Sequence, residues 1–164
     1  MKKWLLAGTL AAAAAVAVVV LVTRHPDEAG SKTAGTPTAP DPLVEDFRAI
    51  ERQCIAAFNA ALARQRANEI DELALAAAIE KDVLTPWREI RGRILVAPIP
   101  EGRKDLYLTL RRYLEARQIA WEAYAAALRA GSEDAARPHY DVYHQKHAEA
   151  QDAARELGRM FREM

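Results

Sequence analysis

Apolar side chains recur at steps of three and four residues along three long segments of the chain. The first segment extends from residue 43 to residue 62, with charged residues between Leu43, Phe47, Ile50, Cys54, Phe58 and Leu62. This spacing places apolar residues on one face of an α-helix. Asp41 and Pro42 come directly before it and provide an N-cap and a first-turn proline. The pattern predicts a helix that begins at this pair.

The apolar stripe weakens from Arg64 to Asn68, which predicts a turn, with Asn68 or Asp71 capping a second helix up to Leu84. One long continuous helix is the alternative. Thr85 and Pro86 form a cap and first-turn pair, so a new short helix is expected to open there. Residues 97–102 contain two prolines and a glycine and predict a loop.

The last two long segments, residues 103–130 and 133–164, carry the clearest pattern. Gly131 is a good C-terminal cap for the first of them, and Ser132 caps the second, in which Pro138 predicts a kink or a late start. Joined by so short a turn, the two helices should form an antiparallel hairpin with heptad-like packing. Their stripes are Tyr107, Leu110, Leu114, Arg117, Trp121, Tyr124 and Leu128, then Tyr140, Tyr143, His147, Ala150, Ala154, Leu157, Phe161 and Met164.

The fold class expected for residues 43–164 is therefore all-α. Three long helices and one or two short ones should form an antiparallel helical bundle. β-branched residues are scarce after Val22, which disfavours a sheet.

Residues 4–22 form an uncharged apolar run that is long enough to cross the hydrocarbon core of a membrane. We expect a retained transmembrane signal anchor, because the run is longer than that of a cleaved signal peptide and no small-x-small site follows it directly. A cleaved signal peptide is the alternative. Lys2 and Lys3 keep residues 1–3 in the cytoplasm, so the main domain should be periplasmic, or extracellular in a single-membrane cell. Residues 23–42, rich in Pro, Thr and Gly, predict a disordered linker.

Composition and charge exclude several classes of protein. The chain has 23 basic and 23 acidic residues, and the two signs alternate along it, which argues against a nucleic-acid partner. Cys54 is the only cysteine, so an intramolecular disulfide, a cysteine-based zinc site and a CxxCH haem attachment cannot form. It falls on an apolar stripe and should behave as a small buried hydrophobe.

Catalytic motifs are missing from the sequence. The only serines are Ser31 in the linker and Ser132 at a helix cap, and there is no nucleophile elbow, zinc-protease or phosphate-loop motif. We therefore expect no enzyme activity and no cofactor. His144 and His147 share a helix face with Asp141, which makes them a weak candidate for a metal site. Solvated side chains with one core histidine are the simpler interpretation.

Arg117 and His147 interrupt the two apolar stripes at nearly equal distances from Gly131 and Ser132. In an antiparallel hairpin they should lie at one level, where their polar groups need partners such as Glu51. Either Arg117 reaches a surface carboxylate and His147 is a neutral core residue, or a polar pocket binds a small anion. The candidate ligand-binding residues are Arg117, His147, Tyr113, Trp121, Tyr124, Tyr140 and Tyr143.

Two functions are compatible with these observations. The first is a membrane-anchored extracytoplasmic helical domain that mediates protein–protein interaction, as a scaffold or accessory subunit of an envelope complex. The second is a helical bundle that senses a small ligand or anion at the level of Arg117 and His147. The first implies a protein partner, and self-association into a homo-oligomer stays open.

Overall fold

A computed structural model describes residues 41–163, and every regular element in that range is a helix. The anchor and most of the linker predicted for residues 1–40, and Met164, lie outside the described residues. The elements are α1 (Pro42–Arg66), α2 (Glu72–Ala78), the π-helical segment η1 (Ile79–Leu84), α3 (Thr85–Val96), α4 (Lys104–Arg129) and α5 (Glu133–Glu163). The all-helical class is confirmed for this range.

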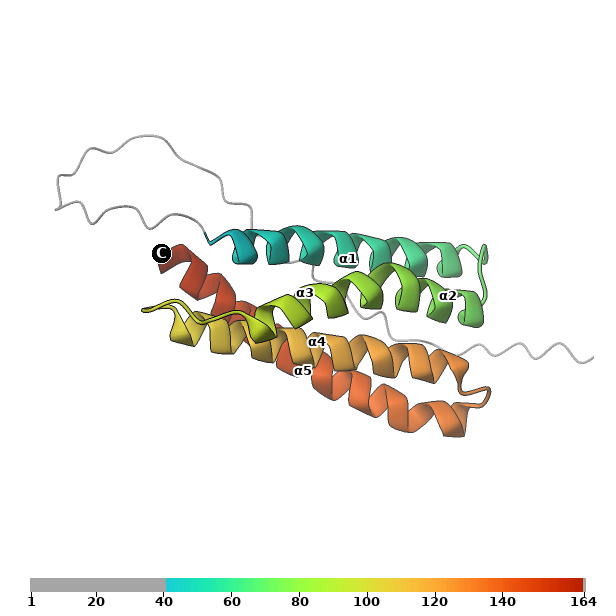
Figure 1. Cartoon of the computed structure of the whole chain (residues 1–164). Coiled ribbons are helices and arrows are strands. Elements are labelled where there is room, and N and C mark those ends of the chain that lie inside the picture. The colour runs from blue at the N-terminus through green and yellow to red at the C-terminus, as the bar shows by residue number, and fades with distance from the viewer. Residues whose placement is uncertain (1–40, 164) are drawn as a thin grey trace, which may run out of the picture. The chain divides into compact units, whose positions relative to one another are not determined.

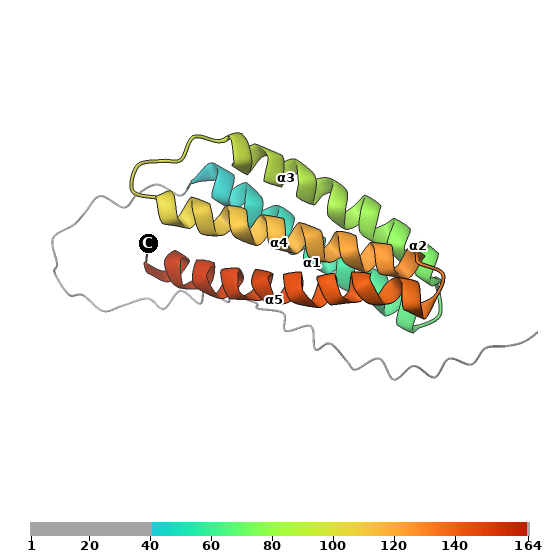
Figure 2. The ribbon, with the colours of Figure 1, turned by 90° about the horizontal axis from the view of Figure 1, so that it is seen from below.

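The helices form an antiparallel bundle (Figures 1 and 2). α1 runs away from the end where Asp41 lies, and the continuous α2–η1–α3 segment returns to it. α4 then runs away again and α5 returns. One end of the bundle, on the left in both figures, therefore holds the start of α1, the α3–α4 loop and the end of α5. We call it the entry end.

Local capping signals set most of the helix boundaries. The Asp41 carboxylate accepts from the Leu43 backbone N–H at 3.0 Å, and Asp71 caps α2 by accepting from Ala74 N–H at 2.8 Å. The turn between α1 and α2 contains Asn68 in the left-handed region, with φ of 58°. The predicted turn is confirmed, and the alternative of one continuous helix is wrong.

Gly131 and Ser132 also act as predicted in the turn between α4 and α5. Gly131 has φ of 72°, which a residue without a Cβ adopts at little cost, and the Ser132 hydroxyl accepts from Ala135 N–H at 3.3 Å. Because α5 already begins at Glu133, Pro138 does not delay its start.

The prediction of a new helix at Thr85 and Pro86 is confirmed in part: α3 begins at Thr85 with Pro86 in its first turn, but Thr85 is not an N-cap. Thr85 has helical backbone angles, φ −61° and ψ −57°, and α2 continues into α3 through the π-helical turn. Pro86 lacks an N–H and its ring crowds the carbonyl four residues earlier, which a wider turn relieves. The Thr85 N–H and hydroxyl both donate to the carbonyl of Glu80 instead.

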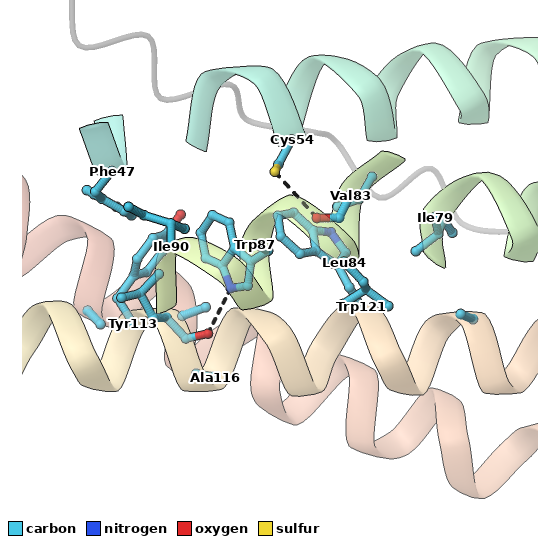
Figure 3. Packing of buried hydrophobic residues seen from close by; sticks show 14 of the residues in the cluster. Phe47, Cys54, Ile79, Val83, Leu84, Trp87, Ile90, Tyr113, Ala116 and Trp121 are labelled. Atoms are coloured by element: carbon cyan, nitrogen blue, oxygen red, sulfur yellow. Dashed lines mark hydrogen bonds between the residues drawn. The ribbon is translucent and has the colours of Figure 1, made fainter. Parts of the chain in front are cut away.

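The core lies between α1, the α2–η1–α3 segment and α4 (Figure 3). Trp87 is fully buried at its centre, and its ring meets that of Trp121 edge-on with centroids 4.9 Å apart. The indole N–H of Trp87 donates to the Leu114 carbonyl at 3.0 Å. Cys54 is fully buried and its thiol donates to the Val83 carbonyl at 3.4 Å, so the expected core role of this cysteine is confirmed.

Helix α4 uses two adjacent faces, whereas the sequence pattern predicted that its large apolar stripe would meet α5. Large side chains such as Leu110, Leu114 and Trp121 belong to the core around Trp87. The face toward α5 follows the helical row of Thr109 and Arg112, whose side chains bond to Glu156 of α5. That row continues through four buried alanines, Ala116, Ala120, Ala123 and Ala127.

Alanines also supply much of the α5 side of this contact. The buried residues of α5 are Ala136, Ala150, Ala153 and Leu157. Small side chains let the two backbones approach closely but remove little apolar area from water. No Cα atom of α5 lies within 8 Å of a Cα atom in any described helix other than α4. Helix α5 is thus held by this row of alanines, by Leu157, Met160 and Phe161, which pack with the core, and by the polar bonds described below.

Candidate functional site

Arg117 and His147 meet across the seam between α4 and α5. Nη1 of Arg117 lies 3.0 Å from Nδ1 of His147, so the prediction that the two side chains share one level is confirmed. The guanidinium also lies over the indole of Trp121, 4.9 Å from the ring centroid. Both polar side chains are half-buried.

The chemistry of arginine decides the tautomer of His147. A guanidinium only donates, so Nδ1 must accept and the proton of a neutral imidazole is on Nε2. Nε2 lies 3.0 Å from the amide nitrogen of Gln151, and since both atoms would then donate, this amide must be turned by 180° so that its oxygen accepts. Burial lowers the pKa of His147, and the charges of Arg117 and His144 lower it further. His147 is therefore a neutral hydrogen-bonding residue.

A carboxylate and a phenol complete this level on the side of α1. The hydroxyl of Tyr113, which is buried, donates to Oε1 of Glu51. Burial raises the pKa of Glu51, while the bond from Tyr113 and the charge of Arg117 oppose that rise. Burial and the adjacent Glu51 raise the pKa of Tyr113 as well. Arg117 thus bonds to His147 on α5, and its charge, together with those of Arg52 and Arg48, favours the ionised form of Glu51 on α1.

Aromatic rings cluster beside this level. The Tyr143 ring stacks on the His147 ring, with centroids 5.5 Å apart and 28° between planes, and it lies 5.1 Å from the ring of Tyr124. Tyr140 lies 6.1 Å from Tyr124 on the other side. Burial raises the pKa of Tyr124 to about 12, so this phenol stays protonated at physiological pH. Phe58 of α1 packs on Trp121 and Tyr124, a contact the sequence did not suggest.

Two buried polar atoms at this level have no hydrogen-bond partner among residues 41–163. They are Nε of Arg117 and Oε1 of Gln118, on consecutive residues of α4. The Gln118 amide nitrogen donates to Glu122 at 2.9 Å. Unpartnered buried groups are uncommon in folded proteins and mark a place where water or a small ligand would be stabilised.

The candidate metal site receives no geometric support. Within the described range, no three side chains of His, Cys, Asp or Glu come together closely enough to hold a metal ion. Both ring nitrogens of His147 already have partners in Arg117 and Gln151. His144 packs against Tyr143 instead, and Asp141 is exposed.

A shallow hollow lies on the surface near this level, between α4 and α5. It has a volume of about 190 Å³ and is lined by side chains of both charges, including Arg112, Glu115, Lys146 and Glu149. Lys146 and Glu149 pair with each other at 2.7 Å, so the charges at its rim are partly compensated.

The chain matches no known protein-family model, no curated protein and no solved structure.

Proposed function

We propose that this chain is a membrane-anchored extracytoplasmic helical domain that acts by protein–protein contact, as a scaffold or accessory subunit of an envelope complex. The observation that carries the proposal is that the polar side chains inside the bundle interact with one another. Arg117, His147, Glu51 and Tyr113 bond to or compensate one another, so their main role is to hold α1, α4 and α5 together. This leaves the surface as the place where the domain meets its partner.

The anchor is proposed from residues 4–22, which carry no charge and follow Lys2 and Lys3. In the range 41–163, no helix is long and apolar enough to cross a membrane. An anchor at residues 4–22 would confine the domain to the membrane face and so raise its effective concentration toward a membrane-bound partner.

Helix α5 offers the longest surface for a partner. It has 31 residues, it packs on α4, and its outer face carries charges of both signs around the exposed Val142. A non-obligate interface is about as apolar as the rest of a protein surface, so this mixed face is compatible with one. A partner helix could lie along this face without any change in the core.

Site-specific photo-cross-linking of the full chain in intact cells tests the proposal. Benzoylphenylalanine would be placed at the exposed positions Val142, His144 and Ala148 of α5, and at Arg52 and Ala56 of α1. We expect light-dependent adducts with the same protein at neighbouring positions of one face. Mass spectrometry of the adducts identifies that protein. If no position on either helix gives a protein adduct, the domain does not act by stable protein contact.

A second function, sensing of a small anion, is favoured by the unpartnered Nε of Arg117. An anion bound there would accept from the guanidinium and stabilise the folded domain. Melting temperatures in the presence of phosphate, sulfate or acetate test this function, with matched ionic strength in sodium chloride as the control. A rise that is lost in Arg117→Gln supports it. Equal melting temperatures in all salts contradict it.

A further inference from the structure

The entry end of the bundle carries an apolar run that the core does not use. Residues 95–100 read Leu-Val-Ala-Pro-Ile-Pro, without a single polar side chain, and they cover the end of α3 and the start of the α3–α4 loop. Val96 is 84% exposed and Leu95 is 41% exposed. Leu108, in the first turns of α4, is 47% exposed. Three of the five large exposed apolar residues among the described ones therefore lie at this end.

This apolar run is held in place. The guanidinium of Arg111 donates to the carbonyls of Ile94 and Ala97, at 3.2 Å and 3.1 Å. The Arg103 N–H donates to the Pro100 carbonyl at 3.1 Å and closes the turn. Two prolines further restrict the loop, so little conformational entropy is lost when it packs against another surface. A loop fixed with its apolar side chains in solvent is preorganised for contact.

The place where the chain enters the domain is tied to the same loop. The Asp41 carboxylate accepts from the Tyr107 hydroxyl at 2.7 Å and pairs with Arg103 at 3.3 Å. Asp41 is the first described residue, so the segment with the proposed anchor at residues 4–22 leads away from this end. The apolar run thus lies at the same end of the domain as the residue from which the chain leads to the proposed membrane segment.

We propose that the entry end docks on the lipid surface, with Leu95, Val96 and Leu108 inserted at the level of the headgroups. This inference rests on the proposed anchor and adds a defined orientation to it. Exposed apolar side chains next to the exposed charged residues Glu101, Lys104 and Asp105 match the boundary between the headgroups and the acyl chains of a membrane. With this end docked, α1 and α5 extend away from the membrane, toward a partner.

Fluorescence quenching in vesicles tests the docking with the full chain. Cys54 is fully buried and burial raises its pKa to about 11, so it does not compete for a thiol label. Single variants Val96→Cys and Leu73→Cys would carry an environment-sensitive fluorophore, and Leu73 is a matched control because it is 63% exposed at the opposite end. The vesicles contain phosphatidylethanolamine, phosphatidylglycerol and a lipid with a nitroxide at its headgroup.

We expect roughly twofold or greater quenching of the label at 96 and little at 73, because an interfacial apolar residue lies about 5–10 Å into the headgroup boundary. Docking is separated from mere closeness to the membrane by a second pair of variants. With the label on Leu108→Cys, an added Val96→Asp should remove the quenching, while Leu73→Asp should leave it unchanged.

The outcomes separate the two proposals. A chain that does not float with the vesicles overturns the anchor and the docking together. A chain that floats, but whose label at 96 is quenched no more than the label at 73, overturns the docking alone. If the label at residue 108 is still quenched in the Val96→Asp variant, the docking is overturned as well. The quenching would then show only that the tether keeps the domain close to the membrane.

Discussion

Arg117 on α4 donates to Nδ1 of His147 on α5 at 3.0 Å, across a seam otherwise formed mainly by alanines. The bond makes Arg117 a central stabilising residue. Replacing it with Ala would leave His147 without its donor and Glu51 without one of its compensating charges. We expect the free energy of unfolding to fall by about 1–3 kcal/mol.

Arg112 is the matched control on the same helix, because its side chain is 59% exposed and pairs with Glu156 of α5. We expect Arg112→Ala to cost about 1 kcal/mol or less, since exposed ion pairs contribute little. Urea unfolding followed by circular dichroism measures both variants. Equal losses would contradict the special role of Arg117.

The lowered pKa of His147 predicts a loss of stability in acid. The unfolded chain, in which the histidine pKa is near 6.5, binds a proton before the folded chain does. The contribution of the neutral His147 ring to the free energy of unfolding is therefore fully present at a pH above the pKa of this histidine in the unfolded chain. It falls as the pH drops below 6.5 and continues to fall until the lowered pKa of the folded state is passed.

Glu51 acts with the opposite sign, because its pKa is raised in the folded state. The folded chain then binds the proton first as the pH falls, and acidification through this window adds stability. His147→Asn separates the two groups, since an amide oxygen can still accept from Arg117 but does not titrate. We expect a smaller stability loss between pH 7 and pH 5.5 in this variant than in the wild type. Identical pH profiles would mean that His147 does not titrate as described.

Asp41 joins three elements of the entry end, and its removal should cost more than the loss of a simple helix cap. It caps α1 and also accepts from Tyr107 of α4 and from Arg103 of the α3–α4 loop. We expect Asp41→Ala to reduce the free energy of unfolding by about 2–4 kcal/mol, the sum of a cap and an unpaired buried hydroxyl. Asp71→Ala, which removes an exposed cap, should cost about 1 kcal/mol. If the two variants melt at the same temperature, Asp41 contributes no more than a simple helix cap.

The row of alanines between α4 and α5 predicts that the contact tolerates only small side chains, because a larger one would push the two helices apart. Ala150 is fully buried in the seam, whereas Ala148 on the same helix is exposed. We expect Ala150→Leu to destabilise the domain by about 1–3 kcal/mol through overpacking, and Ala148→Leu to change stability by about 0.5 kcal/mol or less. Amide hydrogen exchange should show faster opening of α5 in the first variant. Normal protection of α5 in Ala150→Leu would show that the seam is not tightly packed.

Local signals explain why much of the fold could be predicted from the sequence. Asp41, Asp71, Gly131 and Ser132 set helix ends through bonds or backbone angles within a few residues. The shared level of Arg117 and His147 follows from their nearly equal distances along the chain to the turn at Gly131 and Ser132.

The features that could not be predicted depend on tertiary contacts. The π-helical turn before Pro86 packs where Cys54 of α1 donates to the Val83 carbonyl. Alanine fits both exposed and buried positions, so the row through Ala120 gave no signal of the seam. Glu51 and Tyr113 were expected near Arg117 and His147, but the bond between these two residues, 62 apart in sequence, could not be predicted.

The anchor at residues 4–22 is the premise of both the proposed function and the docking at the entry end. N-terminal sequencing of the mature protein, purified from the membrane fraction, tests it most directly. We expect the mature chain to begin at residue 1 or 2 and to remain in the membrane pellet after a carbonate wash. A mature chain that begins beyond Thr23 and is released by the wash would identify a secreted protein and contradict the account.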